Sequence, residues 1–169
     1  VTMAQTLDTV GLDLAQLSGE EVPKLIGDEG SPIYGRSYKA LRPSSLAEAE
    51  ADAEWYVPKE NNQQSTINNQ QLTIPALLID TYHPTLRGGT GETGDWSMSA
   101  KLAEMIPGLM LAGGLNADNV ADAVRQIRPF AVDVASGVEA SPGKKDHNWV
   151  RAFIQNAKSI NNQQSTINN

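Results

Sequence analysis

Residues 108–137 read GLMLAGGLNADNVADAVRQIRPFAVDVASG, and this stretch decides the fold class. An apolar run at 108–112 ends in two glycines, a helical pattern follows at 117–127, and a second apolar run at 131–134 ends in Ser136-Gly137. A strand, a glycine turn, an amphipathic helix and another strand form the repeating unit of a parallel sheet. Because the strands are apolar throughout, we expect helices to cover the outer face of the sheet.

The same alternation extends over most of the chain. We expect strands within 12–17, 33–41, 75–80, 108–112 and 131–134, and helices at 1–10, 20–26, 45–55, 97–105, 117–127 and 147–157. Ser44 and Asn116 are expected to cap the helices that follow them. The fold class is therefore α/β, with about five parallel strands and alternating helices, as in a doubly wound sheet or a (βα)8 barrel.

An Asn/Gln-rich repeat interrupts this pattern. The string NNQQSTINN occupies residues 61–69, continues into Gln70-Gln71, and recurs at 161–169. Both copies are uncharged and nearly free of apolar residues, so we expect disorder. An identical peptide at two unrelated places favours an inert insert over a functional segment. We expect one domain over residues 1–160, interrupted by the low-complexity insert 61–71, and a disordered tail at 161–169.

The composition of the 169 residues excludes several classes of protein. Thirteen basic and 20 acidic residues give a formal charge of −7, which is a poor match for nucleic acid. The absence of cysteine excludes disulfides, thiolate metal sites and a cysteine nucleophile within this chain. No apolar run reaches the roughly 18 residues of a membrane helix, and the first residues do not resemble a signal peptide. We expect a cytoplasmic protein with no membrane partner.

Asp80 ends an apolar strand, where carboxylates of such folds face the mouth of the active site and act as general acids. A turn aspartate is an equally good interpretation of its position. Further along, Gly88, Gly89, Thr90 and Gly91 offer clustered backbone N–H groups and mobility suited to a substrate loop. A plain flexible turn explains that string at least as well.

Gly113-Gly114 and Ser136-Gly137 form two similar turns, each between a strand and a helix. Such turns let backbone N–H groups approach a phosphate, and we favour this interpretation over tight turns alone. His83 and His147 have no partner at metal-ligand spacing, so no metal is expected. No dinucleotide-binding or P-loop motif is present, and no cofactor is expected.

Five strings, in this order and spacing, resemble phosphoribosylanthranilate isomerase, the tryptophan-biosynthesis enzyme with a TIM (βα)8 barrel. They are Leu78-Ile79-Asp80, 88–96 (GGTGETGDW), 111–116 (LAGGLN), 132–139 (VDVASGVE) and 141–146 (SPGKKD). Upstream, Leu14 to Glu20 is similar to the fourth-strand motif of the family and Tyr38 to Arg42 to the fifth. Ser18 stands where the family usually has histidine, and Gly94 where it usually has phenylalanine.

The resemblance implies that this chain is a C-terminal portion of the barrel, five strands of eight. The family begins with a strand that carries a catalytic cysteine and a second-strand loop whose arginine grips the substrate carboxylate. Neither is matched here, and the lack of cysteine agrees with this. The resemblance therefore implies an incomplete TIM barrel that lacks the first three βα units.

The resemblance also implies a reaction, the Amadori rearrangement of N-(5-phosphoribosyl)anthranilate to the carboxyphenylamino-deoxyribulose phosphate. Asp80 matches the general acid, and Gly113, Gly114, Ser136 and Gly137 match the phosphate-binding turns. Without the general base, we expect this isomerase to be inactive alone. The alternative is a non-catalytic remnant, or a split-enzyme half that binds phosphate or a partner chain: a missing N-terminal half or a second copy. Indole-glycerol-phosphate synthase is disfavoured, because the string after Asp80 is not its pattern.

Overall fold

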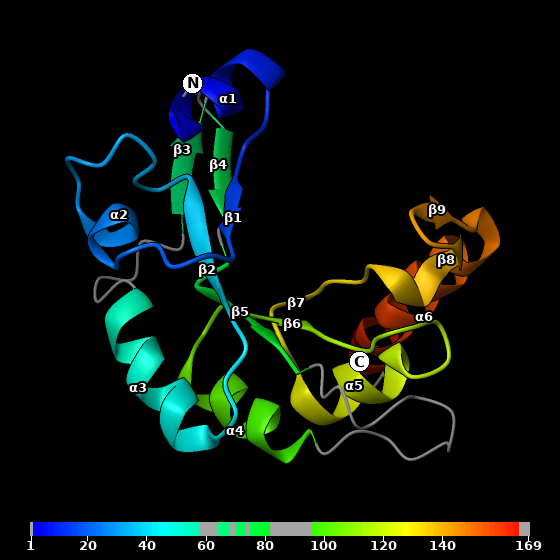
Figure 1. Ribbon diagram of the computed structural model, residues 1–169. Helices are drawn as coiled ribbons and strands as arrows, with labels where there is room; N and C mark the ends of the chain where they lie inside the picture. The colour runs from blue at the N-terminus through cyan, green and yellow to red at the C-terminus, as the bar shows by residue number, and fades with distance from the viewer. Residues whose placement is uncertain (1, 58–63, 68–69, 74, 82–95, 166–169) are drawn as a thin grey trace.

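The computed structural model describes residues 2–57, 64–67, 70–73, 75–81 and 96–165. Five strands form its main sheet in the order β1-β2-β5-β6-β7, and each is parallel to its neighbours (Figure 1). These strands are β1 Ala15–Leu17, β2 Ser37–Leu41, β5 Leu77–Asp80, β6 Leu109–Ala112 and β7 Ala131–Val132. Spatial order follows chain order, so the carboxyl ends of all five strands meet at one edge of the sheet.

Helices alternate with these strands, which confirms the predicted α/β class. They are α1 Met3–Val10, α2 Lys24–Gly27, α3 Leu46–Tyr56, α4 Ser97–Met105, α5 Val120–Ile127 and α6 His147–Ser165. After β7, a 3₁₀ turn η1 at Ser136–Val138 leads into a small antiparallel hairpin, β8 Glu139–Ser141 and β9 Lys144–Lys145. The chain then enters α6.

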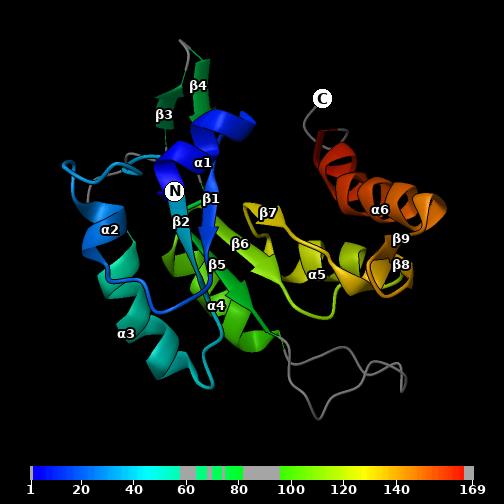
Figure 2. The same cartoon turned by 45° about the horizontal axis from the view of Figure 1, so that its top comes forward.

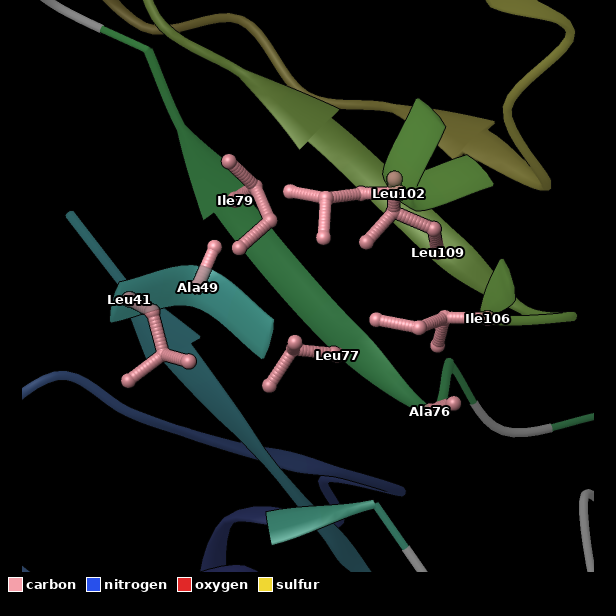
Figure 3. Close-up of a cluster of buried hydrophobic side chains, with 8 residues drawn as sticks. All are labelled: Leu41, Ala49, Ala76, Leu77, Ile79, Leu102, Ile106 and Leu109. Atoms are coloured by element: carbon pink, nitrogen blue, oxygen red, sulfur yellow. The ribbon is translucent and has the colours of Figure 1, made fainter. Parts of the chain in front are cut away.

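The outer face of the sheet packs on α3 and α4, as Figure 3 shows. Leu77 and Ile79 of β5 are fully buried there, because residues two apart on a strand share a face. The α3 residue Ala49 and the α4 residue Leu102 close over them. Leu78, on the opposite face, is also buried. The continuous apolar pattern of this strand therefore reflects burial on both faces, and the predicted helical cover is confirmed.

A second core joins β6 to α5 and α6. The predicted amphipathic helix, α5, supplies Val120, Ala123 and Ile127, all buried, and they pack with Leu111 of β6 and Phe153 of α6. Burial of a Val, Leu, Ile or Phe side chain contributes about 1.5–3 kcal/mol relative to exposure. Val138, after β7, is buried in the same core, so these contacts join β6 to the segment after β7.

The start of α3 differs by one residue from the prediction. Ser45, not Ser44, is the N-cap, and its side chain accepts a hydrogen bond from the Glu48 backbone at 3.2 Å. Ser44 instead donates its backbone N–H and its hydroxyl to Glu48 Oε2, at 2.7 and 2.6 Å. Two adjacent serines share the helix start, so a pattern based on one cap residue could not separate them.

Parts of both Asn/Gln segments have regular backbone structure, which departs from the expected disorder. Gln64–Ile67 (β3) and Gln70–Thr73 (β4) pair as an antiparallel hairpin, and α6 extends to Ser165. Strand pairing satisfies backbone groups without apolar side chains, and extending an existing helix costs far less than starting one. Figures 1 and 2 show the hairpin beside α1, where β1 and β2 begin. It therefore lies at the end of the sheet opposite the predicted catalytic residues.

A buried ion pair ties the loop after β1 to β2 and α3. Lys39 is 3% exposed, and its ammonium contacts Glu21 Oε2 at 2.7 Å and donates to the Gly19 carbonyl. The same ammonium lies 5.4 Å from the ring centroid of Tyr56, whose hydroxyl donates to the Glu21 carbonyl at 2.8 Å. A buried charge of this kind requires its partner, because removing one member leaves the other uncompensated.

We expect Glu21→Gln to change how stability depends on pH. The hydrogen bond from Lys39 lowers the pKa of Glu21 from its ordinary value of 4.5. A carboxylate whose folded pKa is lowered stabilises the fold above its unfolded pKa, and that contribution disappears as pH falls through the folded pKa. The variant should therefore be less stable than the parent at pH 7, and the difference should shrink below about pH 4.5. Urea unfolding of both proteins at pH 7 and pH 3 measures this.

The matched control is Glu20→Gln, at the exposed neighbouring position. It removes the same charge from the same loop without breaking the contact to Lys39. A difference between Glu21→Gln and the parent that is equal at both pH values would show that the ion pair contributes nothing through its ionisation.

Candidate functional site

A pocket of about 190 Å³ lies at the carboxyl ends of β5, β6 and β7. It brings together five of the residues that the sequence indicated, namely Asp80, Gly113, Gly114, Ser136 and Gly137. Asp80 is the last residue of β5 and pairs in register with Ala112, the last residue of β6. The acid candidate is thus one strand away from the first glycine turn, and both turns line the same space.

The turn after β6 depends on left-handed backbone that glycine adopts readily. Gly113 has a φ of 99° and Gly114 a φ of 65°. Two asparagines brace the turn: the Asn119 side chain donates to the Gly114 carbonyl at 3.0 Å and accepts from the Asn116 backbone at 2.9 Å. Asn119, not Asn116, is the N-cap residue of α5, so the predicted cap was wrong by three residues. Asn116 instead accepts from the backbone of Asp118 and Asn119.

The turn after β7 touches the first turn directly through Gly137. A Cβ built on Gly137 would overlap the Leu115 carbonyl oxygen and lie 2.9 Å from its carbon. Real Cβ atoms do not approach backbone this closely, so only glycine fits between the two turns. Gly114, in contrast, has open space around its own Cβ position. The two glycines therefore serve different purposes, conformation at Gly114 and close approach at Gly137.

Asp80 is held by an arginine that its sequence position did not reveal. Arg42, just beyond β2, donates from Nε to Asp80 Oδ2 at 2.8 Å. The Arg42 side chain is 79% exposed and that of Asp80 is 18% exposed. Because the arginine lies in solvent, this ion pair contributes little to stability.

A second carboxylate, Asp133, lines the same pocket and was not among the sequence candidates. It follows β7, and its backbone N–H donates to the Leu111 carbonyl of β6 at 2.8 Å. Burial raises the pKa of the Tyr38 hydroxyl, and the negative charge of Asp133 adds to that effect. The sequence prediction placed Asp133 inside a strand at 131–134, whereas β7 ends at Val132, so the strand-end signal that identified Asp80 did not single out Asp133.

The proposed substrate loop and one of the two histidines lie outside the part of the chain that the structure describes. The loop is Gly88, Gly89, Thr90 and Gly91, and the histidine is His83. No group of three or more His, Asp or Glu side chains in the described part of the chain could hold a metal ion. Within the same part, every helix is too short or too polar to cross a membrane.

Comparison with known proteins places the chain in a family. Residues 2–156 match the family model of N-(5'-phosphoribosyl)anthranilate (PRA) isomerase. The chain belongs to the PRA isomerase family. It is 42% identical over 159 residues to the PRA isomerase of Geobacter sp. (strain M21), covering 92% of this chain and 66% of that protein. To the enzyme of Pelobacter propionicus it is 39% identical over 154 residues, covering 91% and 63%.

Solved PRA isomerases have the same arrangement of strands and helices. The crystal structure of the enzyme from Thermotoga maritima superposes with a TM-score of 0.67 at 34% identity, covering 92% of this chain and 66% of that one. Another PRA isomerase structure holds reduced 1-(o-carboxyphenylamino)-1-deoxyribulose 5-phosphate, and it matches with a TM-score of 0.63 at 31% identity. The present chain spans about two thirds of the length of these relatives. Its five parallel strands match part of their TIM barrel, which confirms the predicted fold class.

Proposed function

We propose that this chain carries the acid and phosphate-binding side of a PRA isomerase active site. The observation that supports this most directly is the shared pocket: Asp80 and both glycine turns line one space in a chain of this family. In this proposal, Asp80 is the general acid, and Gly113, Gly114, Ser136 and Gly137 hold the substrate phosphate. Gly88, Gly89, Thr90 and Gly91 remain the proposed substrate loop.

The proposed reaction converts N-(5-phosphoribosyl)anthranilate into the carboxyphenylamino-deoxyribulose phosphate. Asp80 gives its proton to the ribose ring oxygen as the C1–O bond breaks, and the anthranilate nitrogen supplies the electron pair that forms a Schiff base. A general base then removes the C2 proton, which leaves an enolamine. The enolamine becomes the ketone when C1 takes up a proton and the C2 hydroxyl loses one. The substrate nitrogen serves as the electron sink, so this scheme uses no metal and no cofactor.

The position of the pocket supports the proposed roles. Asp80 lies on β5 and the two turns follow β6 and β7, so a ligand anchored by its phosphate at the turns extends its sugar toward the acid. The two turns present backbone N–H groups, which suit an anion without adding side-chain charge. A relative's structure holds reduced 1-(o-carboxyphenylamino)-1-deoxyribulose 5-phosphate, and this supports the choice of a 5-phosphate ligand.

We further propose that residues 1–160 correspond to the fourth to eighth βα units of the barrel. A (βα)8 barrel has eight strands and the described sheet has five, with β1 and β7 at its two edges. Three further units between these edges would close the barrel and supply the general-base cysteine, since the 169 residues contain none. The partner in this proposal is a missing N-terminal half, and the chain alone should not isomerise the substrate.

Supplying the three missing units tests this function. We expect the 169-residue chain alone to give no detectable ketone product from N-(5-phosphoribosyl)anthranilate. When the first three βα units of a relative such as the Geobacter enzyme are added, we expect product to form. A cysteine-to-alanine variant of the added units is the matched control, and it should form no product. Efficient turnover by the chain alone would mean that the base has been assigned to the wrong residue.

The alternative, a non-catalytic half that binds phosphate, has support in the lack of cysteine. Titration with inorganic phosphate, followed by the backbone amide signals of Gly114 and Gly137, separates the two functions. Phosphate binding without any activity after addition of the missing units would favour the non-catalytic half. Unmoved amide signals would remove the phosphate site from both proposals.

A further inference from the structure

Lys145 lies outside the pocket and contacts one of the residues that line it. Its ammonium donates to the Ala135 carbonyl at 2.7 Å and to Glu139 Oε1 at 2.9 Å. Ala135 lines the pocket together with Ser136 and Gly137, while Lys145 does not. The Lys145 ammonium therefore contacts the backbone of the candidate phosphate site without lining the pocket itself.

The contact determines the direction of a backbone donor. The Ala135 carbonyl and the Ser136 N–H belong to the same trans peptide group, in which the two point in opposite directions. A lysine that holds the carbonyl on one side therefore directs the Ser136 N–H to the other side. The positive ammonium beside the carbonyl oxygen also polarises the peptide, which strengthens its N–H as a donor.

Further contacts hold Lys145 and its neighbours in place. Glu139 Oε2 accepts from the Gly143 backbone at 3.2 Å, so the same carboxylate holds both the lysine and the tip of the β8–β9 hairpin. At the next residue, Asp146 donates its backbone N–H to the Val138 carbonyl at 2.8 Å and caps the first turn of α6. Figures 1 and 2 show the hairpin against the beginning of this helix. Lys145 thus lies between the turn after β7, which its ammonium contacts, and the start of the 19-residue helix α6.

The ionisation of Glu139 agrees with a persistent contact. The hydrogen bond from Lys145 lowers the pKa of Glu139, and the Gly143 N–H lowers it further. The carboxylate therefore stays charged at neutral pH, and its attraction for the ammonium is retained.

We propose that Lys145 is a positioning residue for phosphate, which orients and polarises the Ala135–Ser136 peptide of the binding turn. This inference rests on the proposed phosphate site and adds a residue to it. The adjacent Lys144 provides a natural comparison. It has the same charge, lies in the same hairpin and is exposed like Lys145, but its side chain contacts no acceptor among the described residues.

The test compares Lys145→Gln, Lys145→Arg and Lys144→Gln in the full 169-residue chain, with inorganic phosphate as the probe. Losing a charge-assisted hydrogen bond should weaken phosphate binding about tenfold in Lys145→Gln. Lys144→Gln removes the same charge and should change binding less than about twofold, because the screened charge of Lys144 contacts no group of the binding turn. Lys145→Arg keeps the charged donor and should retain most of the affinity. Amide signals of β5 and thermal melting report whether each variant is folded.

The backbone amide of Ser136 gives a second measurement that does not need the ligand. In phosphate-free protein, Lys145→Gln should shift this signal, while Lys144→Gln should leave it in place. If the parent chain does not bind phosphate, the proposed site fails, and this amide shift alone decides whether Lys145 orients the peptide. Equal phosphate affinity in Lys145→Gln and the parent, an equal loss in both glutamine variants, or an unmoved Ser136 amide would overturn the positioning role. If Lys145→Gln does not fold, Glu139→Gln, which loosens the lysine without removing it, should shift the same amide.

Discussion

Gly137→Ala is expected to disrupt the pocket and destabilise the chain by about 3 kcal/mol, at the upper end of the cost of overpacking. The added methyl group would occupy the position of the Leu115 carbonyl, and both partners are backbone, so neither can move aside as a flexible side chain could. The turns after β6 and β7 must separate to admit it. We assign phosphate binding to both turns together, so it should be lost when the two turns separate. Urea unfolding and phosphate titration of the variant measure the two effects.

Gly114→Ala is the matched control, because it adds the same methyl group to the other turn. No atom lies within 4 Å of its Cβ position, but its φ of 65° is unfavourable for alanine. The expected cost is about 1–2 kcal/mol of backbone strain, without a clash. Gly137→Ala should therefore be the more damaging of the two. If the two variants are equally stable, the close approach of the turns does not contribute to the fold.

The contrast between these glycines shows what the sequence could predict about the site. Paired turns after neighbouring strands indicated a shared binding site, and the structure places both in one pocket. The pattern could not distinguish a glycine needed for its φ from one needed for close approach. The carbonyl that excludes a side chain at Gly137 belongs to Leu115, which is 22 residues away in sequence and adjacent only after folding.

The contacts that were missed are long-range side-chain contacts. Arg42 and Asp80 are separated by 38 residues, and Lys145 reaches a carbonyl ten residues earlier across a hairpin. Apolar periodicity predicts which residues share a buried face, and it predicted the strands and the amphipathic helix α5. It contains no information on which polar side chains meet at the ends of those strands. The sequence therefore predicted whether each element is a helix or a strand. The polar contacts at the ends of the strands could be seen only in the structure.

Asp80→Asn should reduce the isomerase activity of the chain, once the missing units are supplied, by a factor of about 10²–10⁴. Asparagine has nearly the same shape as aspartate and fills the same place at the end of β5, but it has no carboxyl proton to give to the ring oxygen. The substitution weakens the ion pair with Arg42, yet that arginine is 79% exposed, so stability should change by less than about 1 kcal/mol. A loss of rate at nearly unchanged stability and unchanged phosphate affinity is the expected result.

Asp133→Asn is the control that tests which carboxylate is the acid, since both line the same pocket. An amide at position 133 still makes hydrogen bonds to a ligand, so we expect a smaller loss of rate than at position 80. The two variants also differ in their relation to the turns, because Asp133 lies on the segment that carries Ser136-Gly137 while Asp80 lies two strands away. A defect in Asp133→Asn that appears mainly as weaker phosphate binding would therefore agree with our assignment. If Asp133→Asn abolishes turnover while Asp80→Asn remains active, the proton donor is Asp133, and the role that we assign to Asp80 is wrong.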